Sequence, residues 1–227
     1  MEYYSRTVNL FVPERSELLS LIAGLATEYV PENPKILDIG SGYGDVTAEI
    51  IKRRPRSSAW LMDISDDMIR LSTCRFSKSP DIHIIRYNLN EDILGATSER
   101  EFDSVVSCLA LHHIAFEKRV GLYRSIREML KPGCLFINGD QFRCASPVID
   151  RWEFDSWIKG IACRIGKQRG TEPSFDEVKN TQLGICRRMK DKPGTIWDMQ
   201  NDLREAGFLS VDCVWKYQNF AVLVAVK

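Results

Sequence analysis

The sequence lacks a net charge and a long apolar run. Basic and acidic residues balance at 31 each among 227 residues, which argues against a general nucleic-acid binder, because such proteins are usually basic. The longest apolar run near the N-terminus, residues 18–26, is broken by Ser20 and Gly24 and is too short to span a bilayer. Residues 1–15 contain no apolar signal-peptide centre. We therefore expect a cytoplasmic protein without a membrane partner.

Closely spaced cysteine pairs are also missing. The seven cysteines are an odd number, and no two of them have C-x-x-C spacing. Several lie in apolar, strand-like runs, which predicts reduced and mostly buried thiols of the kind found in a reducing cytoplasm. No metal site is predicted from these residues.

Apolar runs alternate with amphipathic segments over the first two thirds of the chain. We predict helices over residues 16–30, 46–54, 65–76 and 117–130, and strands over 35–39, 59–62, 82–87, 102–109 and 134–138. Strands that alternate with helices imply a parallel sheet with helices on both faces.

The alternation stops near Gly139. Residues 143–192 are helical in pattern and rich in Trp, Arg and Lys, and a helix over 196–206 and strands over 209–216 and 220–226 follow. Three residues separate these strands, which predicts an antiparallel pair. We therefore predict one α/β domain over residues 1–227: a Rossmann-like, doubly wound, seven-stranded sheet, mostly parallel with an antiparallel last strand. An N-terminal flap and helix would span 1–31, and a helical lid insertion 143–192.

A glycine-rich turn, ILDIGSGYG at 36–44, lies between an expected strand and an expected helix. Glycines at such a turn let the backbone approach a ligand closely. Asp63 ends the next strand, where an acid can accept hydrogen bonds from both hydroxyls of a ribose. A dinucleotide site expects a third glycine where Asp45 stands, and an acid there would repel a pyrophosphate. Asp38 adds negative charge, so a cationic, phosphate-free nucleoside such as S-adenosylmethionine (SAM) fits the turn better.

Several motifs in the same order resemble those of class I SAM-dependent methyltransferases. They are ILDIGSGYG at 36–44, MDIS at 62–65, RYNLNED at 86–92, FDSVVSCLALHHI at 102–114 and REMLKPGCLFING at 127–139. The stretch LREAGFLSVDCVWKYQNFAVLVAVK at 203–227 resembles the family's closing helix and hairpin. The segments LFVPERSELLSLIAGLA at 10–26 and 217–220 are similar to a narrower branch. That branch includes carboxy-SAM synthase, an enzyme of tRNA wobble-uridine modification, and many small-molecule methyltransferases.

The resemblance implies a cofactor site at the carboxyl ends of the strands. It assigns to SAM the residues Asp38, Gly40, Ser41, Gly42, Asp63, Ile64, Met68, Asn88, Leu89 and Cys108. In this assignment the glycine-rich turn lies against the methionine part, Asp63 holds the ribose, and Ile64 and Met68 enclose the adenine. Arg15 stands in a VPER segment where the carboxy-SAM branch has V-P-G-Y. It is predicted either to pair with the SAM carboxylate or to lie solvated in a first helical turn.

Candidate catalytic residues follow the fourth and fifth expected strands. His113 is the candidate general base and His112 a candidate substrate contact. The alternative for the pair is a structural role, as a helix cap or a hydrogen bond to the lid. Asp140 is the second catalytic candidate and Gln141 a substrate contact, unless both cap the helix that follows.

Two aromatic residues complete the substrate candidates. Trp152 belongs to an aromatic stripe of the lid insertion, which alternatively is lid core. Tyr4 belongs to the N-terminal flap and either folds over the site or frays in solvent.

The predicted function is transfer of the SAM methyl group to a small-molecule acceptor by in-line displacement, with S-adenosylhomocysteine (SAH) as the product. Because the sulfonium is already an activated leaving group, such a protein mainly aligns the reactants and excludes water. The alternatives are a carboxy-SAM synthase-like enzyme, which converts SAM with a carboxylated donor such as prephenate, and a SAM-binding protein without turnover. A nucleic-acid substrate is not expected, and the chain is expected to be a monomer or a homodimer.

Overall fold

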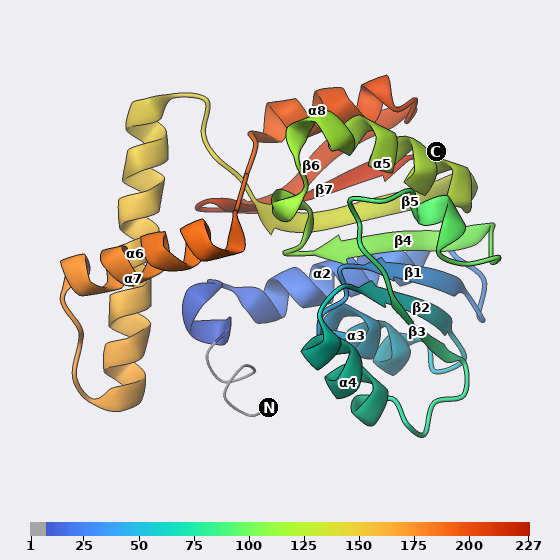
Figure 1. The fold of residues 1–227 in the computed structure, drawn as a ribbon, viewed down its shortest axis with the longest axis horizontal. Coiled ribbons are helices and arrows are strands. Elements are labelled where there is room, and N and C mark those ends of the chain that lie inside the picture. Colours follow the sequence, from blue (N-terminus) through green and yellow to red (C-terminus); the bar gives the residue numbers. More distant parts are fainter. Residues whose placement is uncertain (1–7) are drawn as a thin grey trace.

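Seven strands form one sheet in the order β3-β2-β1-β4-β5-β7-β6 (Figure 1). The strands are β1 (Lys35–Ile39), β2 (Ser58–Asp63), β3 (Ile82–Arg86), β4 (Phe102–Cys108), β5 (Leu130–Gln141), β6 (Ser210–Tyr217) and β7 (Phe220–Val226). Strands β1 to β5 pair in parallel, whereas β7 runs antiparallel to both β5 and β6. The predicted doubly wound sheet with an antiparallel last strand is confirmed. This computed structural model describes residues 8–227, so Tyr4 lies outside the described residues.

Helices cover both faces of the sheet. They are α2 (Arg15–Glu28), α3 (Asp45–Arg53), α4 (Asp66–Arg75), α5 (Phe116–Met129), α6 (Pro147–Arg169), α7 (Phe175–Met189) and α8 (Ile196–Glu205), with short 3₁₀ turns η1 (Ile93–Gly95) and η2 (Leu111–His113). Figure 1 shows α5 and α8 over one face and α2, α3 and α4 over the other. None of the described helices is long and apolar enough to cross a membrane.

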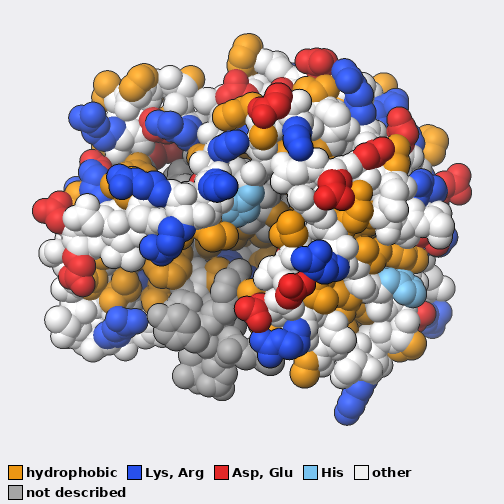
Figure 2. Space-filling view, viewed as in Figure 1, with side chains coloured by type: hydrophobic (Ala, Val, Ile, Leu, Met, Phe, Trp, Pro, Cys, Tyr) orange, Lys and Arg blue, Asp and Glu red, His pale blue; other side chains and the backbone are white. Residues whose placement is uncertain are grey.

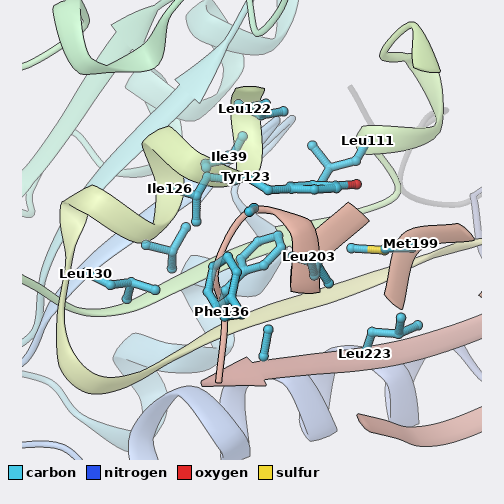
Figure 3. Packing of buried hydrophobic residues seen from close by; sticks show 14 of the residues in the cluster. Ile39, Leu111, Leu122, Tyr123, Ile126, Leu130, Phe136, Met199, Leu203 and Leu223 are labelled. Atoms are coloured by element: carbon cyan, nitrogen blue, oxygen red, sulfur yellow. The ribbon is translucent and has the colours of Figure 1, made fainter. Parts of the chain in front are cut away.

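Two apolar clusters hold these layers together. In the first, Tyr123 and Ile126 of α5 and Leu203 of α8 pack on Phe136 of the sheet, and all four are almost completely buried (Figure 3). In the second, Leu18 and its neighbours on α2 pack with residues of α3 and α6 against the opposite face. Burial of such side chains contributes roughly 1.5–3 kcal/mol each, so the sheet is anchored from both sides.

The helical insertion, residues 143–192, separates β5 from α8. In Figure 1 its helices α6 and α7 project beyond the carboxyl ends of the parallel strands. Trp157 of α6 is only 4% exposed, and its indole Nε1 donates to the carbonyl of Phe11 at 2.6 Å. Arg164 adds a 2.8 Å hydrogen bond from its Nε to the carbonyl of Leu10. The insertion is therefore docked on the segment that precedes α2.

The structure differs from the expectations at two places. Strand β5 begins at Leu130, four residues earlier than predicted, because the Lys131-Pro132-Gly133 segment is looped out within the strand as a register shift against β4. The cysteines are all free, but none is fully buried: three are exposed and four are half-buried. The prediction of mostly buried thiols is wrong, because several of these runs lie at the rims of the sheet and on exposed helix faces.

Candidate active site

The glycine-rich turn links β1 to α3 at the carboxyl edge of the sheet. Gly40 has a φ of +64°, and a Cβ there would lie 2.2 Å from the Cβ of Ala110, so no side chain fits. Gly42 has a φ of +53°, and its missing Cβ faces open space. Glycine is the residue that reaches such positive φ values at little cost. The turn therefore presents bare backbone to the space in front of it.

Asp63, the last residue of β2, holds this turn in place through hydrogen bonds. Its Oδ2 accepts the backbone N–H of Gly42 at 2.8 Å, and its Oδ1 accepts the N–H of Ser65, also at 2.8 Å. Each carboxylate oxygen can accept a further hydrogen bond. The geometry thus leaves Asp63 able to receive two hydroxyl groups while it holds the turn in place.

Asp38 lies on β1 directly behind the turn and is completely buried. The hydroxyl of Thr47 donates to its Oδ2 at 2.6 Å. Its Oδ1 is buried and has no hydrogen-bond partner among the described residues. Burial raises the pKa of Asp38 to about 7, despite the opposing hydrogen bonds from Thr47. A cationic group arriving at Oδ1 would compensate this buried carboxylate.

A cavity of about 380 Å³ opens in front of the glycine-rich turn, Asp63 and Asp38. Figure 2 shows this face of the molecule hollowed near its centre, where hydrophobic side chains and a histidine meet. All eleven residues that the sequence analysis assigned to the cofactor line the cavity. They are Arg15, Asp38, Gly40, Ser41, Gly42, Asp63, Ile64, Met68, Asn88, Leu89 and Cys108. The structure brings them together, and their individual roles toward SAM stay predictions.

Arg15 and Asp45 form an ion pair at the mouth of the cavity. Arg75 is also paired with Asp45, at 2.7 Å. Burial alone would raise the pKa of Asp45, but the two guanidinium groups outweigh it and hold that pKa below its ordinary value. The expected repulsion of a pyrophosphate by Asp45 is therefore weaker than the sequence suggested, because two cations neutralise the carboxylate. Sequence reasoning missed this triad, since its members come from three different helices.

The two histidines lie on η2 rather than at the end of a strand, and they face different surroundings. His113 lines the main cavity, whereas His112 lies behind it and lines a small second cavity with Asp140 and Gln141. The Nδ1 of His112 is 2.5 Å from the Oδ1 of Asp140, and its backbone N–H donates to the Oδ2 at 3.0 Å. Asp140 is thus placed as a partner of His112, outside the main cavity.

Charge and burial act oppositely on these imidazoles. Burial alone would lower the pKa of His112, but the carboxylates of Asp140 and Asp191 outweigh it and raise that pKa. Burial, followed by the charge of His112, lowers the pKa of His113. An imidazole with a lowered pKa is unprotonated at neutral pH, as a general base must be.

The remaining candidates divide between the cavity and the surface. Burial raises the pKa of the Cys108 thiol far above neutrality, so this residue offers the cavity a neutral thiol. Trp152 is 67% exposed and is not among the residues that line the cavity. Met189, at the end of α7, does line it. Sequence reasoning did not single out Met189, because no local pattern marks which residue of an insertion turns toward a distant sheet edge.

Comparison with known proteins agrees with the fold and indicates a methyltransferase domain. Residues 37–136 match a family model described as a methyltransferase domain. Carboxy-S-adenosyl-L-methionine synthase of Shewanella piezotolerans is 20% identical over 219 residues, which cover 95% of this chain and 85% of that protein. The ubiquinone/menaquinone biosynthesis C-methyltransferase UbiE of Bordetella avium is 26% identical over 166 residues, covering 73% of this chain and 61% of that protein.

Solved structures share the fold. Human N-acetylserotonin methyltransferase in complex with SAM superposes with a TM-score of 0.59 at 16% identity, covering 94% of this chain. The chain spans 52% of the length of that human protein. Residues 37–136 thus match a methyltransferase domain, and the chain has the fold of a solved methyltransferase that binds SAM.

Proposed function

We propose that the protein transfers a methyl group from SAM to a small-molecule acceptor. The observation that carries this proposal is the unpartnered, buried Oδ1 of Asp38 beside the bare backbone of Gly42 and the carboxylate of Asp63, all in one cavity wall. When bound, SAM supplies a methyl group on a sulfonium leaving group. The chain itself needs only to hold, orient and shield the reactants.

The wall formed by β1, β2 and the loop after β3, which we call the cofactor wall, suits the nucleoside part of SAM. Asp38 is placed for the α-ammonium group, which would compensate its buried charge. Asp63 is placed for the ribose hydroxyls, while Ile64, Met68 and Leu89 offer apolar contact to the two faces of an adenine. These assignments stand on the position of each residue in the cavity wall and on the chemistry of its side chain.

The part of the lining that follows β4 and ends α7, which we call the acceptor wall, suits an apolar acceptor. It contains Leu109, Ile114 and Met189, with His113 as its titratable group. A cavity of this size lies within the range of small-molecule sites, roughly 300–1,000 Å³. His113 is placed to accept a proton from an acceptor hydroxyl or activated carbon, should the acceptor have to lose one.

The test is turnover with SAM whose methyl group carries an isotope label. The purified protein is incubated with a panel of phenols, quinols and small hydroxylated acids, and SAH and labelled products are measured by mass spectrometry. SAH formed together with a labelled product supports the proposal. Tight SAH binding by calorimetry without any turnover would identify a SAM-binding protein instead.

A second candidate is the carboxy-SAM synthase reaction. The carboxy-SAM synthase relatives cover 95% of the chain, and Arg15 offers a cation at the cavity wall whose Nε is buried without a hydrogen-bond partner among the described residues. An added carboxylate on the cofactor would need such a donor. Incubation with SAM and prephenate distinguishes the two candidates, because carboxy-SAM has a different mass from both SAM and SAH.

A further inference from the structure

Three side chains from distant segments converge beside the cavity. His112 and His113 come from η2, and Asp191 follows α7 in the helical insertion. The Oδ1 of Asp191 is 3.0 Å from the Nδ1 of His113 and 3.9 Å from the Nε2 of His112. One ligand-type atom from each of the three side chains lies within 4.8 Å of the other two.

Two of these atoms are left unsatisfied. The Nδ1 of His113 and the Oδ1 of Asp191 are both buried, and neither has a hydrogen-bond partner among residues 8–227. They are 3.0 Å apart, the separation of an ion pair with a protonated imidazole, but they form no hydrogen bond with each other. A buried polar atom without a partner costs about 1–3 kcal/mol. A ligand that binds both atoms at once would remove this cost.

The ring of His112 is oriented by a contact at the nitrogen that faces away from Asp191. Its Nδ1 lies against the carboxylate of Asp140, at 2.5 Å. When Nδ1 carries the proton, Nε2 has its lone pair free on the side of Asp191. A carboxylate behind the imidazole is the usual support of a metal-binding histidine, because it fixes the tautomer and the ring orientation.

The backbone holds Asp191 at this place. The N–H of Asp191 donates to the carbonyl of Cys186 at 3.0 Å, and the N–H of Lys192 donates to the carbonyl of His112 at 2.7 Å. The buried guanidinium of Arg119 also donates to the carbonyl of Lys192. These hydrogen bonds fix the backbone at Asp191 and Lys192, and the fixed backbone holds the Asp191 carboxylate beside the two histidines.

We propose that His112, His113 and Asp191 bind a divalent transition-metal ion. Two imidazoles and one carboxylate form a ligand set that suits Zn²⁺, Fe²⁺ or Mn²⁺. Three protein ligands leave coordination positions for water or for an oxygen atom of an acceptor. Because His113 also lines the cavity, the ion would lie at the acceptor side, and His113 would then act as a ligand instead of a general base.

The test uses the full chain, stripped with a chelator and dialysed. Zn²⁺ is titrated by calorimetry, and Co²⁺ is added separately because its visible absorption reports on the ligand type. We expect one equivalent of Zn²⁺ and a Co²⁺ spectrum without thiolate charge transfer. His113→Ala and Asp191→Asn should each weaken Zn²⁺ binding at least tenfold, and Asp140→Asn should do so by roughly tenfold through His112.

His83→Ala is the matched control, because His83 is exposed on β3 and its ring contacts that of Trp60 instead of the cluster. It should bind Zn²⁺ like the wild type. Circular dichroism and SAH affinity report whether each variant still folds and binds the cofactor. Absence of stoichiometric binding in the wild type, equal binding in His113→Ala and Asp191→Asn, or a thiolate band from the free cysteines would each overturn the proposal.

Discussion

The two walls of the cavity are built in different ways. The cofactor wall takes Asp38 and Asp63 from adjacent strands and Gly42 from the turn between β1 and α3, and a 2.8 Å hydrogen bond joins Gly42 to Asp63. The acceptor wall joins η2 to the helical insertion, through contacts between residues far apart in the sequence. A local motif therefore defines the first wall, whereas only the docking of the insertion creates the second.

The surroundings of the two walls also differ in whether a cationic group compensates their buried carboxylates. The cofactor wall holds a buried carboxylate that has no cation of its own and whose pKa is raised to about 7. Behind the acceptor wall, the carboxylates of Asp140 and Asp191 lie against two histidines. The first wall is thus prepared for a cationic ligand, and the second is already partly compensated. The following variants separate these two behaviours.

Removal of Trp157 should have the largest effect, because this side chain docks the insertion on which the acceptor wall depends. Trp157→Ala should lower the free energy of unfolding by roughly 3–5 kcal/mol, measured by urea denaturation. Trp152→Ala is the control from the same helix and should change it by less than about 0.5 kcal/mol, since Trp152 is largely exposed. Similar losses in both variants would contradict the docking role of Trp157.

Asp38→Asn should stabilise the protein without ligand. A carboxyl whose folded pKa is raised binds its proton more tightly when folded, so its stabilising contribution is complete below its unfolded pKa, near 3.8, and is lost as pH rises through about 7. At about pH 8 the variant should gain roughly 2–4 kcal/mol, since a tenfold change in proton affinity corresponds to about 1.4 kcal/mol. The gain should shrink toward about pH 4.

Urea denaturation across this pH range measures the effect of Asp38→Asn. The same substitution should weaken SAH binding, because the buried charge that attracts the ammonium group is gone. A variant whose stability stays parallel to that of the wild type at every pH would show that Asp38 is not held as a high-pKa carboxyl.

His113→Ala tests the acceptor wall. Turnover should fall by roughly a hundredfold, because either role considered for His113, a general base or a metal ligand, acts on the acceptor. Calorimetric affinity for SAH should change little, since the cofactor wall is intact. His83→Ala serves as the control. A wild-type rate in His113→Ala would assign the residue a structural role.

Asp63→Ala tests the cofactor wall. It should weaken SAH binding by roughly 1–3 kcal/mol, the scale of lost hydrogen bonds to a charged group, and calorimetry measures this directly. Asp67→Ala is the matched control, because Asp67 is exposed and forms a surface ion pair with Arg70. Unchanged SAH affinity in Asp63→Ala would remove the ribose assignment.

Sequence patterns predicted most of the fold, because they report on local geometry. The alternation of apolar runs predicted the strands of the parallel sheet, and the helix predicted over residues 65–76 forms as α4, with the Ser65 hydroxyl accepting the N–H of Met68. The start of β5 was missed because the Lys131-Pro132-Gly133 segment normally ends an element, whereas here β4 pairs with β5 on both sides of it, at Leu130 and from Leu135 onward. Strand pairing supplied information that the local residues do not contain.

The residues of the candidate site also divide into those that local sequence patterns predicted and those that only strand and helix packing brought together. The glycine-rich turn, Asp38 and Asp63 could be identified from the sequence, because a strand, a tight turn and a helix place neighbouring residues at one sheet edge. The pairing of Asp45 with Arg15 and Arg75, and of Asp191 with the two histidines, could not. These contacts join residues whose distance is set only when helices from different parts of the chain pack on the sheet.

The sequence by itself therefore determined the class of the fold and that the glycine-rich turn, Asp38 and Asp63 meet at one cavity, since hydrophobic periodicity and glycine at positive φ are properties of single segments. Only the tertiary structure decided that the pKa of Asp38 is raised, that His112 turns toward Asp140, that Met189 reaches the cavity, and that Asp191 reaches His113. Burial and charge pairing depend on everything that surrounds an atom. That environment exists only once the helical insertion has docked against the sheet.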